Sequence, residues 1–151
     1  MLHIVLVEPE IAPNTGNIAR LCAAAGARLH LVGRLGFRLD ARSLRRAGVD
    51  YWEHVDLVRH NHWAEFALEW SGGRLWAFSA KATRPYTGAD FRDNDALVFG
   101  GESRGLPASI LERDPSRTVT IPMPTGHVRS LNLATAAGIA LYEALRQLNL
   151  W

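Results

Sequence analysis

The chain has 151 residues, which is the size of one ordinary domain and too short for two domains of similar size. With 48% hydrophobic and 21% charged residues, the composition is that of a globular protein and excludes a disordered chain. The net charge of +2 is too small to indicate a nucleic-acid partner by itself. We therefore expect a single folded domain over residues 1–151.

The composition excludes further classes of protein. The only cysteine, Cys22, rules out an intrachain disulfide and any zinc site built from several cysteines. The apolar runs fall short of the roughly 18 residues that span a membrane. The start, MLHIVLVEPE, lacks the basic region and cleavage site of a secretory signal. We therefore expect a soluble, cytoplasmic protein that does not contact membranes.

Strand-like and helix-like segments alternate along the chain. Apolar runs over residues 2–7 and 28–32 predict two buried strands. Between them Asn14 or Thr15 can cap a helix, which Gly26 would end in a left-handed conformation. The later elements are expected to be short helices over residues 40–47 and 62–70, strands over residues 74–79, 96–100 and 117–121, a short helix opened by Pro107, and a long amphipathic helix over about residues 131–148. This alternation predicts an α/β fold with a parallel sheet, in which ligands bind beyond the carboxyl ends of the strands.

Common nucleotide and metal motifs do not match the chain. The first predicted strand is followed by NTGN instead of the dinucleotide-binding pattern GxGxxG. The turn over residues 100–105 has the spacing of a P-loop, but Leu106 and Pro107 stand where that motif needs Lys and Ser or Thr. His60 and His62 are close in sequence, and on the expected loop such a pair is most often solvated surface. An NTPase and a histidine metal site are therefore not expected.

Three polar segments interrupt the pattern of apolar strands and ordinary turns. Each lies just after a candidate strand, so in a parallel sheet all three should meet at one edge. Glycines beside them would let a nucleoside approach the backbone closely. Arg104, inside the second segment, is not expected to be a free surface charge. The three segments are Asn14–Asn17 with Arg20 one helical turn later, Gly100–Gly105, and Ile121–Met123 together with Arg129–Asn132.

The residues NTGNIAR, FGGESRGLP and IPM…RSLNLA resemble, in order and spacing, the three motifs of SPOUT-class RNA 2′-O-methyltransferases. The resemblance covers nearly the whole chain, from Val7 to Ala144. It is closest to the small TrmL (YibK-like) tRNA wobble-position methyltransferases, which consist of the catalytic domain alone. The chain departs from this pattern at Gly101, where relatives often carry proline, and at residues 78–80, which are often richer in threonine. Both departures would loosen cofactor contacts.

The resemblance implies a fold, an assembly and a cofactor. The fold is a single-domain parallel-sheet SPOUT fold with a C-terminal trefoil knot, which ordinary topology rules would argue against. The assembly is a homodimer in which the first motif of one chain faces the cofactor of the other. The cofactor is S-adenosylmethionine, which leaves as S-adenosylhomocysteine, and no metal is implied. By motif match, the cofactor-binding residues are Phe78, Gly100, Glu102, Ile121, Met123, Ser130 and Leu131.

The chemistry assigns roles to residues of the first motif. Methyl transfer to a ribose 2′-hydroxyl needs that hydroxyl to be positioned and to lose its proton. The resemblance assigns this catalytic role to Arg20. Because a guanidinium with a pKa above about 12 is a poor base, we favour electrostatic stabilisation of the developing 2′-alkoxide. Asn14 and Asn17 are expected to shape the loop that presents Arg20, with ordinary helix capping as the alternative. Glu102 is expected either to meet the cationic end of the cofactor or to cap its own turn.

Arginines are concentrated on one predicted helix face. Such a face is usually only solvated, but a catalytic domain without an appended RNA module must bind RNA with its own surface. We expect this face to contact the phosphates of a tRNA anticodon stem-loop, with a flipped-out nucleotide in the site. The alternative for Arg129 is an ion pair with Glu102. The expected RNA-binding residues are Arg38, Arg42, Arg45, Arg46 and Arg129.

The function expected from the sequence is therefore an S-adenosylmethionine-dependent tRNA (cytidine/uridine-2′-O-)-methyltransferase acting on the wobble nucleotide, position 34. One alternative is a SPOUT enzyme that acts on another tRNA position or on ribosomal RNA, although larger relatives with such targets commonly add an N-terminal RNA-binding domain. A second is a non-catalytic RNA-binding relative. A third is a flavodoxin-like protein that binds a small ligand without using the three polar segments.

Overall fold

The chain folds around one sheet of six parallel strands in the computed structural model, which describes residues 1–39 and 52–151. The strand order is β3-β2-β1-β5-β4-β6, so β1 and β5 lie at the centre. All neighbouring strands pair in parallel, which confirms the predicted fold class. The strands are β1 (His3–Val7), β2 (Arg28–Val32), β3 (Leu57–His60), β4 (Leu75–Phe78), β5 (Ala96–Phe99) and β6 (Thr118–Val119).

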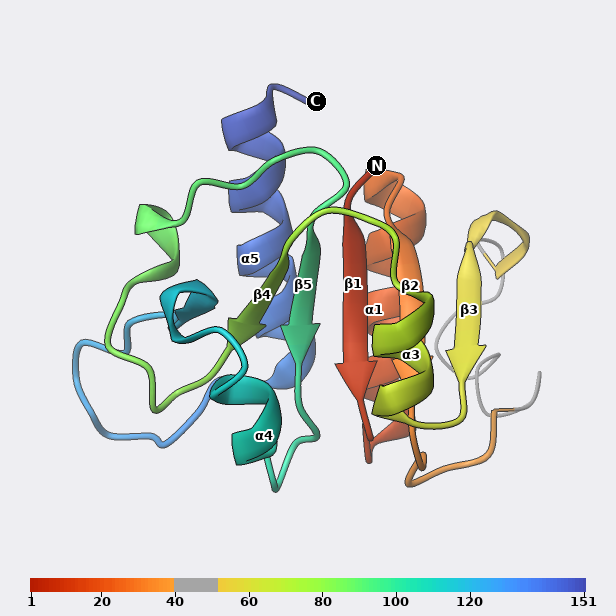
Figure 1. The fold of residues 1–151 in the computed structure, drawn as a ribbon, viewed down its shortest axis with the longest axis horizontal. Coiled ribbons are helices and arrows are strands. Elements are labelled where there is room, and N and C mark those ends of the chain that lie inside the picture. The colour runs from red at the N-terminus through yellow and green to blue at the C-terminus, as the bar shows by residue number, and fades with distance from the viewer. Residues whose placement is uncertain (40–51) are drawn as a thin grey trace.

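Helices cover both faces of the sheet (Figure 1). On one face lie α1 (Ala12–Ala25) and α5 (Leu133–Leu148), and on the other lie α3 (Trp63–Glu69) and α4 (Ala108–Leu111). Short 3-10 turns complete the described elements: η1 (Trp52–His54), η2 (Tyr86–Gly88) and η3 (Pro115–Arg117).

The central strands are buried on both faces. In β1, Ile4 and Leu6 belong to the core under α1 and α5, whereas Val5 and Val7 belong to the core under α3 and α4. Successive side chains of a strand point to opposite faces, so a strand buried on both sides needs an unbroken apolar run. This explains why the sequence shows such runs rather than alternation.

The predicted strands and helices are confirmed within the described residues, with three corrections. The sequence pattern does not predict β3, an edge strand whose Leu57 and Val58 are only partly buried and whose Arg59 is exposed. The interpretation of His60 as solvated surface is wrong, because His60 ends β3 and is 6% exposed. Pro107 precedes α4 as its N-cap residue instead of standing inside the first turn. The predicted helix over residues 40–47 lies outside the described residues.

The start of α1 also differs from the prediction. The N-cap residue is Ile11, whose side chain makes no cap hydrogen bond, and Asn14 lies within the first turns of the helix. Gly26 ends the helix at a φ of 70°, as predicted. At α5, Asn132 is the cap, since its side-chain oxygen accepts hydrogen bonds from the backbone N–H groups of the second and third helical residues at 2.9 and 3.2 Å. The trefoil knot stays a prediction.

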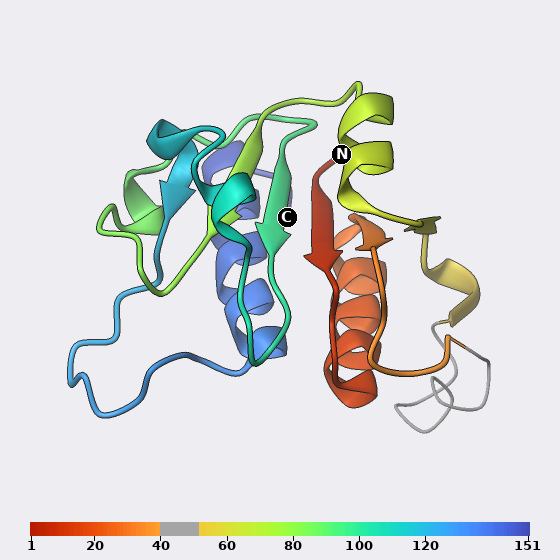
Figure 2. The same cartoon turned by 60° about the horizontal axis from the view of Figure 1, so that its bottom comes forward.

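The loops that follow β1, β5 and β6 lie near one another. Figure 2 shows the long segment between β6 and α5 leaving the sheet and returning to the start of α5, beside the loop that follows β5. The same view places the start of α1 at this end of the molecule. The fold thus brings the three polar segments to the edge where parallel α/β sheets bind ligands.

Candidate active site

A hydrogen-bond network joins the three polar segments. The carboxylate of Glu102 accepts hydrogen bonds from the backbone N–H groups of Glu10 and Ile11, at 2.9 and 2.8 Å, and from the side-chain amide of Asn14 at 3.2 Å. Asn132 in turn donates a hydrogen bond from its side-chain amide to the side-chain oxygen of Asn14 at 3.1 Å. The predicted convergence of the three segments is therefore confirmed.

Glu102 caps a helix, but not in its own turn. Its carboxylate accepts from the backbone N–H of Ile11, the N-cap residue of α1, at a helix start where N–H groups and the helix dipole favour negative charge. These hydrogen bonds hold the loop after β5 against the start of α1. A contact between Glu102 and the cofactor stays a prediction.

The loop over residues 100–105 is folded too tightly to accept side chains at its first two positions. A Cβ atom at Gly100 would lie 2.0 Å from the carbonyl carbon of Gly105, and one at Gly101 would lie 2.6 Å from the carbonyl oxygen of Glu8. The backbone N–H of Gly105 donates to the carbonyl of Gly101 at 2.9 Å and closes the loop. Glycine at position 101 therefore matches the close approach of Glu8.

An apolar cavity lies beside this loop, and five of the seven predicted cofactor-binding residues line it. Its volume is about 100 Å³. The rings of Phe78 and Phe99 stack in its wall, with centroids 4.7 Å apart. Gly100 and Glu102 lie in the adjacent loop but do not line the cavity. The lining residues that the sequence predicted are Phe78, Ile121, Met123, Ser130 and Leu131, and those that it missed are Ser79, Ala80, Phe99, Thr120 and Ala136.

The chemistry of this lining fits the adenosine part of S-adenosylmethionine. Flat apolar side chains can cover a purine ring, and the hydroxyl groups of Ser79, Thr120 and Ser130 offer hydrogen bonds to polar edges. The described residues lining this cavity include no charged side chain. We refer to it as the cofactor cavity.

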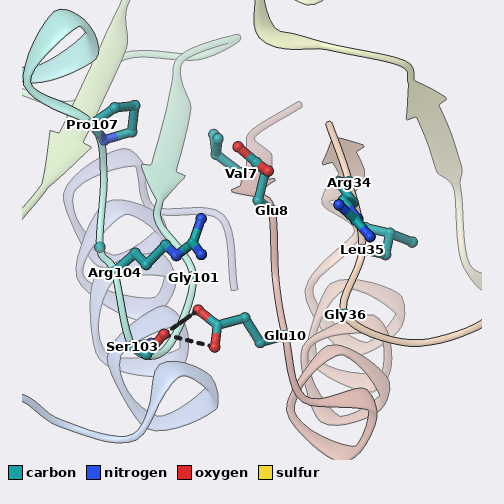
Figure 3. A pocket seen from close by; sticks show the side chains of 11 residues that line it. Val7, Glu8, Glu10, Arg34, Leu35, Gly36, Gly101, Ser103, Arg104 and Pro107 are labelled. Carbon is teal, nitrogen blue, oxygen red and sulfur yellow. Dashed lines mark hydrogen bonds between the residues drawn. The ribbon is translucent and has the colours of Figure 1, made fainter.

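A second, larger cavity lies between the loops that follow β1, β2 and β5 (Figure 3). Its volume is about 700 Å³, and we refer to it as the polar cavity. Glu8, Glu10, Arg34, Ser103 and Arg104 contribute its charged and hydroxyl-bearing side chains. Figure 3 shows the Arg104 side chain extending into it, and the residue is exposed. A cavity of this size holds a nucleotide-sized ligand.

Glu10 forms one wall of the polar cavity. The hydroxyl of Ser103 donates to the two oxygens of Glu10 at 2.7 and 2.8 Å, and the backbone N–H of Ser103 donates at 3.1 Å. These hydrogen bonds, with a smaller contribution from the charge of Arg104, lower the pKa of Glu10. Nearby, Glu8 has a φ of 51°, in the left-handed region that non-glycine residues seldom adopt. Such strained positions occur preferentially at functional sites. The backbone conformation of Glu8 is a signal for the polar cavity that the sequence could not supply.

The residues predicted for catalysis share α1. Asn14 is buried in the network with Glu102, whereas Asn17 and Arg20 are exposed on the helix surface. Among the predicted RNA-binding residues, Arg38 and Arg129 are exposed. Three others, Arg42, Arg45 and Arg46, lie outside the described residues. Their predicted roles stay predictions.

The fold and the two cavities define a ligand-binding α/β protein with its site at the carboxyl edge of a parallel sheet. Residues 1–142 match the model of the SpoU rRNA methylase family, and the chain belongs to this family. It is 50% identical over 149 residues to the tRNA (cytidine(34)-2′-O)-methyltransferase of Saccharophagus degradans, with 98% of this chain and 96% of the relative covered. It is 48% identical over 149 residues to the Escherichia coli K12 protein of the same name, with coverage of 98% and 94%.

Solved structures show the same fold. A structure described as giving insights into the 2-OH methylation of C/U34 on tRNA superposes with a TM-score of 0.91 at 53% identity, covering 99% of this chain and 91% of the other. The SpoU methyltransferase AviRb from Streptomyces viridochromogenes, in complex with AdoMet, superposes with a TM-score of 0.84 at 27% identity, covering 99% of this chain and 58% of that one. No helix in residues 1–39 or 52–151 has the length and apolar character needed to cross a membrane.

Proposed function

We propose that the chain is an S-adenosylmethionine-dependent tRNA 2′-O-methyltransferase that acts on the ribose of the wobble nucleotide, cytidine or modified uridine at position 34. The observation that carries the proposal is the interlocked set of three motif loops beside the cofactor cavity, in a chain 48–50% identical to two tRNA (cytidine(34)-2′-O)-methyltransferases. The chain is 48–50% identical to these relatives but only 27% identical to AviRb, which favours the tRNA enzymes.

The cofactor cavity binds the adenosine part of the cofactor. When bound, S-adenosylmethionine supplies a methyl group already activated by its sulfonium for in-line transfer. Phe78, Ile121 and Leu131 exclude water from the purine, and the hydroxyl of Ser130 hydrogen-bonds to a polar edge. The neutral lining suits a neutral ring, since a buried unpaired charge there would cost free energy.

The polar cavity holds the nucleotide that accepts the methyl group. Arg34 and Arg104 bind phosphate oxygens, for which arginine provides paired donors. Glu8, which also lines this cavity, accepts hydrogen bonds from base or ribose donors. A nucleotide flipped into this cavity is thereby held through its backbone and its edges together.

In the proposed homodimer, Arg20 of one chain faces the site of the other and handles the charge that develops on the 2′-oxygen. Because its guanidinium stays protonated, it stabilises the forming alkoxide and binds the adjacent phosphate. Asn14 positions the start of α1, and with it the helix that carries Arg20, through its hydrogen bonds to Glu102 and Asn132. Asn17, exposed on the same helix, borders this surface.

The rest of the tRNA contacts lie on the protein surface. Exposed Arg38 and Arg129 neutralise phosphates of the anticodon stem-loop, together with Arg42, Arg45 and Arg46. The chain acts as a homodimer, which gives a partner to the exposed Tyr142 and Trp151 stacked at the end of α5 with ring centroids 6.3 Å apart. We expect this activity in the cytoplasm, because its substrate is tRNA.

The proposal is tested in a strain that lacks the gene. We expect its tRNA to lose a 2′-O-methyl group at the wobble nucleotide, and plasmid-borne wild-type protein to restore it, as measured by mass spectrometry of isolated anticodon fragments. An Arg20→Ala plasmid is the matched control and restores little methylation. An unaltered wobble nucleotide in the deletion strain would overturn the proposal.

A further inference from the structure

Three buried histidines cross the sheet on the face that α3 covers. His3 on β1, His30 on β2 and His60 on β3 are each 6% exposed. Nδ1 of His3 lies 3.0 Å from Nε2 of His30, and Nδ1 of His30 lies 3.0 Å from Nε2 of His60. We call this row the histidine ladder. It lines neither the cofactor cavity nor the polar cavity, and the proposed methyl transfer does not use it.

The hydrogen bonds of the ladder determine where its hydrogens lie. At one end the amide oxygen of Asn94 lies 3.3 Å from Nε2 of His3, and because an oxygen can only accept, this nitrogen carries the hydrogen. In a neutral ring Nδ1 of His3 must then accept from His30, and Nδ1 of His30 must accept from His60. All three rings are buried, which favours their neutral form. Nδ1 of His60 is left as a bare lone pair.

This lone pair points toward acidic side chains of α3. Among the residues that the structure describes, Nδ1 of His60 is buried without a hydrogen-bond partner. It faces Oε2 of Glu69 at 3.8 Å, and one ligand atom each from His60, Glu65 and Glu69 lie within 4.8 Å of one another. A nitrogen lone pair opposite a carboxylate is repulsive unless a cation lies between them. A cavity of about 360 Å³ beside these residues and the 63% exposure of the Glu69 side chain give an ion access.

We propose that His60, Glu65 and Glu69 bind one divalent transition-metal ion of the zinc class. The ligands are Nδ1 of His60 and one oxygen from each carboxylate, a nitrogen and oxygen set that zinc accepts, with water in the fourth position. Tetrahedral ligands at about 2.0–2.2 Å from zinc lie about 3.4 Å apart, so small movements of the partly exposed Glu65 and the exposed Glu69 close the site.

The histidine ladder supports this site from behind. Metal-bound histidines almost always donate their other ring N–H to an acceptor that fixes the ring, and His30 is that acceptor for His60. Glu65 and Glu69 are four residues apart on α3 and therefore share one face of the helix. The bound ion would tie α3 to the edge strand β3. It stabilises the fold and takes no part in the methyl transfer.

The test is a titration of the purified, untagged full chain with Zn²⁺ by calorimetry at pH 7.5. We expect one ion per chain, with affinity reduced at least about tenfold in Glu69→Gln and in Glu65→Gln. The matched control is Glu53→Gln, because the Glu53 carboxylate also lies near a histidine, 3.5 Å from Nε2 of His54, but both groups are exposed. It should bind Zn²⁺ like the wild type. Absent binding, or equal affinity in Glu69→Gln and Glu53→Gln, would overturn the proposal.

A second measurement separates a metal ion from a proton at the same nitrogen. Nitrogen-15 NMR of the histidine rings should show Nδ1 of His60 without hydrogen at pH 7.5, and Zn²⁺ should shift this resonance but not those of the exposed His127. A hydrogen on Nδ1 of His60 that persists in the presence of Zn²⁺ would contradict the metal site. Neither measurement depends on methyl transfer, so the metal site can fail or hold independently of the proposed function.

Discussion

The two cavities beside the loop over residues 100–105 are lined by opposite kinds of side chain. The cofactor cavity is built from aromatic, aliphatic and hydroxyl groups, whereas the polar cavity gathers two glutamates and two arginines. Phe99 lines the first and Gly101, only two residues later, lines the second. One tight loop thus separates a neutral cavity, which we propose for the cofactor ring, from a charged cavity, which we propose for the nucleotide. If the proposed assignment holds, the binding of cofactor and of tRNA can be changed separately, although both sites depend on the same loop.

The largest effect is expected from a residue that lines neither cavity. Arg20→Ala should lower kcat about 100- to 1,000-fold, because it removes the charge that stabilises the alkoxide. Cofactor affinity, measured by calorimetry, should be unchanged. Arg20→Lys keeps a charge and should retain part of the rate with the pH–rate profile of the wild type. A near-wild-type rate in Arg20→Ala would show that the chemistry does not use this arginine.

A charge introduced into the cofactor cavity should weaken the binding of the cofactor but not of tRNA. Leu131→Asp places a carboxylate in the apolar lining, and we expect S-adenosylmethionine affinity to fall about tenfold or more while tRNA affinity is retained. The matched control is Leu68→Asp, at a leucine that is 89% exposed on α3. Calorimetry with each ligand measures both affinities. Equal losses of cofactor and tRNA binding would argue against separate cavities.

Loss of the Glu102 carboxylate, which holds the loop between the two cavities, should affect binding in both cavities. Glu102→Ala leaves the N–H groups of Glu10 and Ile11 and the amide of Asn14 without their acceptor. We expect a decrease of about 1–3 kcal/mol in the free energy of unfolding, together with weaker binding of cofactor and tRNA. Urea unfolding measures the first effect, with exposed Glu112→Ala as the control. Unchanged stability would mean that the loop is held by other contacts.

A smaller effect is expected from the polar cavity. Arg104→Ala should weaken tRNA binding a few-fold, and the slope of log affinity against log salt should become shallower by about one phosphate contact. Cofactor affinity should not change. Arg113→Ala, also exposed but outside the polar cavity, serves as the control. If both variants show the same salt slope as the wild type, Arg104 does not contact phosphate.

The smallest expected effect is the pH dependence that arises from Glu10. The pKa of Glu10 is lowered in the folded state, mainly by its hydrogen bonds from Ser103. The stabilisation from these bonds is therefore fully present above the unfolded pKa of 4.5 and is lost as the pH falls through the lower folded value. The amide proton resonance of Ser103, followed by NMR, should titrate with a midpoint below 4.5. A midpoint at or above the unfolded pKa would contradict the hydrogen bonds from Ser103 to Glu10.

The sequence predicted the lining residues of the cofactor cavity better than those of the polar cavity. Ile121, Met123, Ser130 and Leu131 belong to motifs that are contiguous in the chain, so a motif match could assign them. The polar cavity joins Glu10, Arg34 and Arg104, which follow three different strands, and only the strand order brings them together. The role of Glu102 was beyond sequence reasoning for the same reason, since its partners lie about 90 residues away.

The same limit explains the edge of the sheet. Apolar runs indicate strands buried on both faces, so the central strands were predictable, whereas β3 is a half-exposed edge strand without such a run. With β3 missed, His60 seemed solvated, and the ladder that it forms with His3 and His30 could not be inferred. The hydrogen bonds of that ladder depend on the parallel pairing of β1, β2 and β3.

The central claim is that a ribose 2′-hydroxyl in the polar cavity receives a methyl group from the cofactor cavity. The most direct test incubates purified protein with radiolabelled S-adenosylmethionine and two synthetic anticodon stem-loops, which differ only in a ribose or a 2′-deoxyribose at position 34. We predict incorporation of label into the ribose form, at nucleotide 34, and none into the deoxyribose form. Equal labelling of both oligonucleotides would contradict the account. So would the absence of label from both the ribose oligonucleotide and full-length tRNA.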